Sequence, residues 1–241
     1  MLQKTRGIVL HSLKYGETGI ITTIYTELFG RISFLLHGTR ARKSPVKSNQ
    51  LQTLYLVELE IYYKPGRDLQ RIKELKNAYP FSSIPFEINK STQVIFLAEI
   101  LNKVLREEES HPELFEFLFY SIQVLDLLNK GIANFHLVFL VQLSRFLGFG
   151  PTNNFTQEVP YYDLMAGVFV PIVPSHPHFL SKEESSVFSA LLNLSYEKAA
   201  EIRIDHSIRN ILPDRILDYF SLHLGSNISL KSLDILREIL H

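Results

Sequence analysis

Hydrophobic positions in the first 78 residues follow a period of two, in short runs separated by turn residues. The clearest run is YLVELEIYY at 55–63, in which apolar positions alternate with Glu58, Glu60 and Tyr62. A period of two is typical of an antiparallel strand with one buried face. The runs that we predict as strands are 7–13, 19–27, 31–37, 55–63 and 69–79. Short strands at this spacing predict a small barrel of the OB type, and an SH3-like barrel fits nearly as well.

The segment KPGRD at 64–68 separates the last two of these runs. Pro65 restricts φ to the value needed at the first central position of a turn, and Gly66 tolerates the positive φ needed at the second. We therefore expect the fourth and fifth strands to form a hairpin.

Beyond Pro80 the period of the apolar positions becomes helical. The first predicted helix lies within 91–109, and the second opens with a Ser110–Glu113 capping box and stops at Gly131. A third helix at 132–148 is almost wholly apolar, which predicts the centre of a helical domain.

The remaining chain contains an irregular stretch and further helices. We expect a hairpin at 161–170 and a helix capped by Ser181 and Glu184. Pro213 is expected to start a helix that ends at Gly225, and Ser229 to cap the last helix. The predicted class is α+β, with an all-β OB-fold domain at 1–79 and an all-α domain at 80–241 that carries an irregular or hairpin insertion at about 150–180.

Charge is distributed unevenly along the chain, although its formal net charge is zero. Residues 1–78 contain 13 Lys and Arg against 6 Asp and Glu, which leaves +7, while the remainder contains 12 against 19, which leaves −7. A positive module of this kind attracts polyanions, of which nucleic acid is the commonest. The sequence therefore predicts a nucleic-acid-binding barrel.

The segment HGTRARKSPVK at 37–47 holds the densest group of cations, namely Arg40, Arg42, Lys43 and Lys47. Clustered cations repel one another until phosphates neutralise them and release condensed counterions. Tyr62 lies opposite the apolar face of its strand, so its ring is the best placed of the strand tyrosines to stack on a base. Further candidate contacts are Arg6, Arg31, Lys64, Arg67 and Arg71.

Several chemistries are absent from the sequence. The chain has no cysteine, which excludes disulfides, thiolate metal sites and cysteine nucleophiles and favours a reducing compartment. There is no phosphate-binding loop and no nucleophile elbow, and His176 with His178 lacks a third ligand. We therefore expect no catalytic residue, metal or cofactor. No apolar stretch is long enough for a membrane span, so we expect a cytoplasmic protein without a membrane partner.

Three segments resemble one family. The opening GIVLHSLKYGETGIITTIYTELFGRISFLLHGTRARKS, the central LGFGP and the closing HLGSNISLKSLDIL are similar to blocks of the RecO family of bacterial recombination mediators. The resemblance implies an OB fold followed by a helical domain, and a nucleoid-associated, non-enzymatic function. It implies binding of single- and double-stranded DNA and strand annealing. It also implies help, with RecR, in loading RecA onto strands coated by single-stranded-DNA-binding protein, whose acidic C-terminal tail the helical domain would receive.

The chain departs from that family in one respect. Many members carry a four-cysteine zinc site after the LGFGP block, and the corresponding residues 152–178 contain no cysteine here. The resemblance therefore implies no zinc. We expect that aromatic packing offsets the missing thiolate ligation, through Phe155, Tyr161, Tyr162, Phe169 and Phe179.

Two other functions are compatible with a basic barrel. The barrel could contact an acidic protein surface, in which case the chain would be an interaction adaptor with incidental DNA affinity. It could also be an RNA-binding OB module.

Overall fold

The computed structural model describes residues 1–241 except 18, 38–45, 107–108 and 241. By internal packing the chain forms two compact units. Unit 1 is Met1–Glu87 with Val94–Asp126, and unit 2 is Ile88–Gln93 with Leu127–His241. The domain boundary expected at residue 80 stays a prediction.

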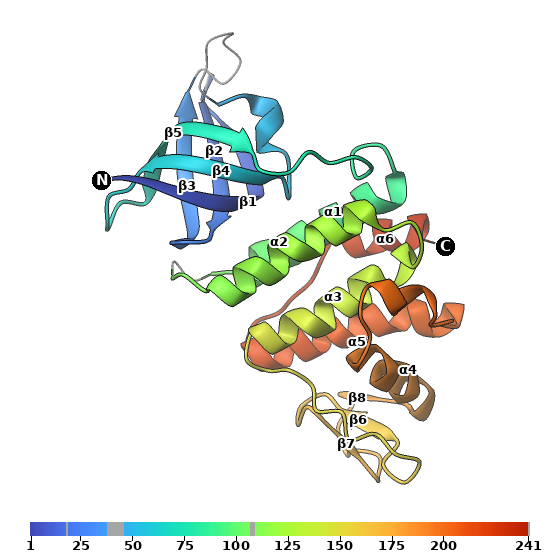
Figure 1. The fold of residues 1–241 in the computed structure, drawn as a ribbon. Helices are drawn as coiled ribbons and strands as arrows, with labels where there is room; N and C mark the ends of the chain where they lie inside the picture. The colour runs from blue at the N-terminus through green and yellow to red at the C-terminus, as the bar shows by residue number, and fades with distance from the viewer. Residues whose placement is uncertain (18, 38–45, 107–108, 241) are drawn as a thin grey trace. The chain divides into compact units, whose positions relative to one another are not determined.

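Unit 1 contains a closed barrel in the strand order β1-β2-β3-β5-β4 (Figure 1). The strands are β1 (Leu2–Tyr15), β2 (Gly19–Thr26), β3 (Gly30–His37), β4 (Leu56–Tyr62) and β5 (Leu69–Asn77). Neighbouring strands are antiparallel except β3 and β5, which pair in parallel. The predicted OB-like barrel is confirmed.

The alternation of apolar and polar residues along β4 determines which of its side chains face the barrel interior. Val57, Leu59 and Ile61 are fully or almost fully buried in the barrel core, while Glu58 and Tyr62 are exposed. The turn between β4 and β5 is confirmed as well, because Gly66 has φ +72°, a value that an L side chain rarely adopts. A short 3₁₀ helix, η1 (Ser48–Leu51), precedes β4.

Two helices follow the barrel, α1 (Ile88–Val104) and α2 (Pro112–Leu127). The predicted Ser110 cap of α2 is wrong. His111 directly precedes the helix, and its Nδ1 accepts the N–H of Leu114 at 3.1 Å. The Ser110 hydroxyl instead donates to the carbonyl of Glu27 at 2.8 Å, a long-range bond that competes with local capping.

Unit 2 is built around α3 (Ile132–Phe146), whose Phe135, Val138 and Phe139 are completely buried. This confirms the predicted apolar centre. Gly131 does not end α2 as expected, because it is the N-cap of α3 with φ +76°. The other elements are β6 (Tyr161–Asp163), β7 (Val168–Val170), β8 (Phe179–Leu180), α4 (Lys182–Leu192), η2 (Glu197–Ala200), α5 (His206–Leu224) and α6 (Ser232–Ile239).

The predicted hairpin at 161–170 is confirmed by antiparallel pairing of β6 with β7, and the Ser181–Glu184 capping box is confirmed at the start of α4. Strand β8 completes a three-stranded sheet in the order β7-β6-β8. Phe169 packs against Tyr162 at 4.8 Å and Phe155 at 5.3 Å between ring centroids, while Tyr161 and Phe179 pair at 6.5 Å. The rings expected to replace a zinc site thus pack as two groups.

The predicted starts of the last two helices are wrong. Helix α5 begins after Asp205, whose side chain accepts the N–H of Ser207 at 2.9 Å, and Pro213 lies inside the helix. Pro213 has no backbone N–H to donate to the carbonyl of Arg209, four residues earlier, and the adjacent carbonyl of Asn210 accepts a hydrogen bond from Arg237 of α6 at 2.8 Å. Helix α6 begins at Ser232 after Lys231, not after Ser229.

Across the described residues, no helix combines the length and hydropathy needed to cross a membrane. In the same part of the chain, no cluster of three or more His, Cys, Asp or Glu side chains could hold a metal ion.

Candidate nucleic-acid interface

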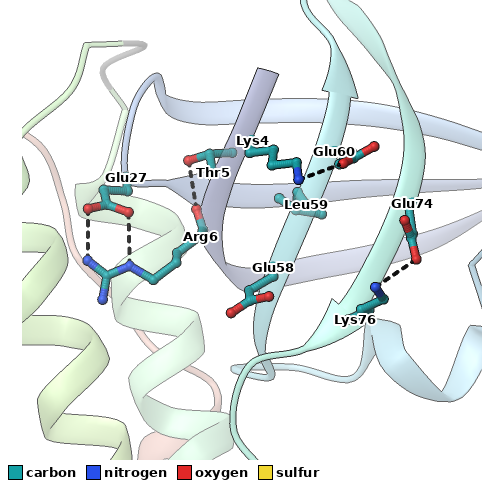
Figure 2. Close-up of a pocket in the computed structure, with 9 residues that line it drawn as sticks. All are labelled: Lys4, Thr5, Arg6, Glu27, Glu58, Leu59, Glu60, Glu74 and Lys76. Atoms are coloured by element: carbon teal, nitrogen blue, oxygen red, sulfur yellow. Dashed lines mark hydrogen bonds and ion pairs between the residues drawn. The ribbon is translucent and has the colours of Figure 1, made fainter. Parts of the chain in front are cut away.

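The outer face of β1, β4 and β5 carries a groove of about 330 Å³ (Figure 2). Charged side chains line it because alternate residues of these strands point outward and meet in cross-strand pairs, such as Lys4 opposite Glu60 and Glu58 opposite Lys76. We call this surface the paired groove, and its lining residues are Lys4, Thr5, Arg6, Glu27, Glu58, Leu59, Glu60, Glu74 and Lys76.

The lysines on this face have carboxylate partners. Lys4 and Lys73 lie 3.2 Å and 2.9 Å from the carboxylate of Glu60, and Lys76 lies 3.0 Å from Glu74. The hydrogen bonds from Lys73 and Lys4 lower the pKa of Glu60. The hydrogen bond to Glu60 raises the pKa of Lys73, and the hydrogen bond to Glu74 raises the pKa of Lys76. A phosphate entering the groove would have to displace these carboxylates, so the paired groove is a poor site for a polyanion.

Arg6 is held inside unit 1. Its guanidinium donates two hydrogen bonds to Glu27, at 2.9 Å and 2.8 Å, and a further one to Glu116 of α2. The same group lies over the rings of Phe115 and Phe119, about 5 Å from each centroid. The Glu27 hydrogen bonds raise the pKa of Arg6 and lower that of Glu27. Arg6 therefore joins β1 to α2, and its charge is already neutralised.

Arg31 also has a structural role. Its guanidinium donates to the carbonyls of Asn102 and Leu105, both at 2.7 Å, and to the side-chain oxygen of Asn102 at 2.9 Å. Carbonyls at a helix C-terminus lack partners within the helix, so Arg31 satisfies the end of α1. Both guanidinium groups thus have partners within the protein, and the contact of Arg6 and Arg31 with DNA stays a prediction.

The end of the β4–β5 hairpin carries exposed side chains that differ from the paired lysines of the groove. Tyr62 and Arg71 are cross-strand partners in the antiparallel register, and both are exposed. Lys64 and Arg67 lie in the connecting loop and are exposed too. Within the described part of the chain, no carboxylate lies within ion-pair distance of Lys64, Arg67 or Arg71. We call Tyr62, Lys64, Arg67 and Arg71 the hairpin surface.

Gln70 fixes the loop that carries two of these cations. Gln70 is 3% exposed, and its Oε1 accepts the backbone N–H of Lys64 at 2.9 Å. Its Nε2 donates to the carbonyls of Lys64 at 2.7 Å and Arg67 at 2.9 Å. The sequence analysis missed Gln70, although a polar residue two positions before the core residue Ile72, on the same face of β5, is a signal that could have found it.

The tyrosine rings divide as the strand period requires. Tyr62 is 48% exposed, whereas Tyr25 is buried and stacks on Phe115 at 6.3 Å. Tyr63 stacks on Phe29 at 4.1 Å, so its ring supports the barrel. Tyr62 is therefore the ring of the hairpin that is open to a base.

Of the basic segment at 37–47, the residues Arg40, Arg42 and Lys43 lie outside the described residues. Lys47 is described and partly buried, and its backbone N–H donates to the side chain of Gln50 at 2.8 Å. Their contact with DNA stays a prediction.

Both parts of the sequence match family models. Residues 1–81 match the model of the recombination protein O N-terminal region, and residues 85–234 match that of the C-terminal region. The chain belongs to the RecO family. It is 43% identical over 239 residues to the DNA repair protein RecO of Phocaeicola vulgatus and 42% identical over 240 residues to that of Bacteroides fragilis, in each case over 99% of both chains. It is 35% identical to that of Flavobacterium johnsoniae over 98% of both chains.

The family match confirms the resemblance read from the opening, central and closing segments. It covers the barrel that carries the hairpin surface and most of the helical part. The RecO family thus accounts for the OB-like barrel followed by helices.

Proposed function

We propose that this chain is a non-enzymatic DNA repair and recombination protein that binds single-stranded DNA through its barrel. The observation that carries the proposal is the contrast between two surfaces of unit 1. The lysines of the paired groove have carboxylate partners, whereas Lys64, Arg67 and Arg71 of the hairpin surface have no carboxylate within ion-pair distance among the residues that the structure describes. An uncompensated cation gains the full benefit of phosphate contact and counterion release.

An exposed ring beside these cations favours a single strand over a duplex. Bases in a duplex are stacked on one another, while an unpaired base can stack on Tyr62, a contact worth about 1–3 kcal/mol per base. The contacts proposed for DNA are thus Tyr62, Lys64, Arg67 and Arg71, together with Lys47, Arg40, Arg42 and Lys43 of the basic segment.

Membership of the RecO family supports the wider role. Relatives that match over nearly their whole length are named DNA repair proteins. On that basis we propose that the chain also binds duplex DNA and anneals strands. We further propose that it acts with RecR and the tail of single-stranded-DNA-binding protein to load RecA, in the cytoplasm at the nucleoid.

The test is a titration of fluorescent oligothymidylate with the whole chain across salt concentrations, with duplex DNA, RNA and polyglutamate as competitors. Engagement of about four to six phosphates predicts a log–log salt slope of about −3 to −4 on single strands. Affinity for oligothymidylate should exceed that for polyglutamate, since a polypeptide offers no bases to Tyr62. Equal affinity for both would support the adaptor alternative, and preferential binding of RNA would support the RNA module.

A further inference from the structure

The side-chain amide of Gln70 is buried and is hydrogen-bonded to the backbone of the loop that carries Lys64 and Arg67. A buried polar side chain is costly unless its hydrogen bonds are made. Both oxygen and nitrogen of the Gln70 amide are bonded, and every bond goes to the backbone of Lys64 or Arg67. The orientation of the amide is fixed by these partners, because a backbone N–H can only donate and a carbonyl can only accept.

The bonds span the whole loop. They join residue 70 to residue 64 at one end and residue 67 near the other, with Gly66 at φ +72° between them. A loop closed in this way holds its backbone in one conformation before any ligand arrives. The backbones of Lys64 and Arg67 therefore lose their conformational entropy during folding, and no further loss occurs when DNA binds.

We propose that Gln70 is a positioning residue for single-stranded DNA. It pre-orders the β4–β5 loop, so that Lys64 and Arg67 contact successive phosphates without a further loss of backbone entropy. This inference rests on the proposed function. Gln70 adds no charge of its own, so its contribution lies in affinity and not in the number of phosphates engaged.

The distinguishing experiment is a double-mutant cycle with oligothymidylate binding as the readout. Gln70→Met removes all three hydrogen bonds at nearly constant volume. We expect roughly 3- to 10-fold weaker binding with an unchanged salt slope, from the cost of ordering a loop on binding. In a Lys64→Ala/Arg67→Ala background, Gln70→Met should have no further effect, because there is no cation left to position.

A matched control separates positioning from loss of stability. Gln142 of unit 2 donates its side-chain N–H to the carbonyl of Leu194 at 3.2 Å, and Gln142→Met should leave DNA affinity unchanged. If Gln70→Met reduced the affinity for oligothymidylate equally in the wild-type and the Lys64→Ala/Arg67→Ala backgrounds, the positioning role would be overturned. If instead Lys64→Ala/Arg67→Ala itself left affinity and salt slope unchanged, the proposed function of the hairpin surface would fail.

A second measurement needs no variant and therefore does not depend on whether Gln70→Met folds. In the free wild-type protein, the amide hydrogen of Lys64 should exchange slowly, since it is bonded to Gln70 before DNA is added. Exchange at the unprotected rate in free protein, with protection only after oligothymidylate is added, would show that DNA orders the loop and would overturn the proposal.

Discussion

Tyr62 of β4 lies directly opposite Arg71 of β5, and both residues are exposed at the end of the hairpin. Cross-strand partners of this kind have Cβ atoms about 4.5–5.5 Å apart. A base on the Tyr62 ring would thus have its phosphate within reach of the Arg71 guanidinium.

Replacement of Tyr62 by alanine should weaken oligothymidylate binding by about 1–3 kcal/mol, because one stacked base is lost. Tyr62→Phe keeps the ring and should bind like the wild type, as measured by fluorescence anisotropy. Tyr120, which is similarly exposed at 55% on α2, provides the control, since Tyr120→Ala should have no effect. Equal losses from Tyr62→Ala and Tyr120→Ala would rule out stacking on the hairpin.

Arg6→Ala should destabilise unit 1 by about 2 kcal/mol, because it breaks charge-assisted hydrogen bonds to Glu27 and removes the cation over Phe115. Urea unfolding measures this loss, and Arg6→Lys should be intermediate because it keeps the charge without the bidentate geometry. The salt slope of DNA binding should stay at the wild-type value. A reduced slope would return Arg6 to the set of DNA contacts.

Asp126 gives unit 1 a pH-dependent stability. Burial alone would raise its pKa, but the N–H groups of Ile84, Ser82 and Ser83 outweigh burial and lower the pKa to about 2. A depressed folded-state pKa stabilises the protein above the unfolded value of 3.8, by about 2 kcal/mol, and this contribution is lost as pH falls through about 2.

Asp126→Asn should therefore destabilise the protein at pH 7, and the difference from the wild type should shrink as the pH is lowered from about 5 toward 2. Urea unfolding at a series of pH values measures the destabilisation at pH 7 and its decrease at lower pH. A difference in unfolding free energy that stays constant over this range would show that the carboxylate charge is not what holds residues 82–84.

The aromatic packing of the three-stranded sheet should be independent of metal. With no cysteine in the chain, incubation with EDTA should leave the melting temperature unchanged. Phe169→Ala should lower the free energy of unfolding by about 3–5 kcal/mol, because Phe169 is 2% exposed and contacts Tyr162 and Phe155. A fall in melting temperature with EDTA that zinc reverses would contradict the view that aromatic packing replaces ligation.

The elements that were predicted correctly depend on local chemistry. The alternation of β4, the positive φ of Gly66 and the Ser181–Glu184 box each follow from residues a few positions apart. The apolar run of α3 belongs to the same class, since burial on all sides leaves a continuous hydrophobic pattern.

Two of the predictions that were wrong involve partners distant in the sequence. Ser110 has the spacing of a cap, but its hydroxyl bonds Glu27, 83 positions away. Pro213 looks like a helix start, yet it lies inside α5, where the carbonyl of Asn210 accepts a hydrogen bond from Arg237, 27 positions further along the chain. The DNA contacts of Arg6 and Arg31 stay a prediction from charge, and the partners of their guanidinium groups, Glu27 for Arg6 and the carbonyl of Asn102 for Arg31, become visible only in the folded structure.

The central claim is that the cations at the hairpin end, which have no carboxylate partner among the described residues, contribute to binding of single-stranded DNA, whereas the paired lysines of the same barrel do not. The most direct measurement compares two variants that each lose three positive charges from unit 1. Lys64→Ala/Arg67→Ala/Arg71→Ala should reduce the magnitude of the log–log salt slope on oligothymidylate by about 2, at about 0.7 per phosphate contact. Lys4→Ala/Lys73→Ala/Lys76→Ala should leave the slope near the wild-type value, because Glu60 and Glu74 already pair with those lysines. Equal changes of slope in the two variants would contradict the account.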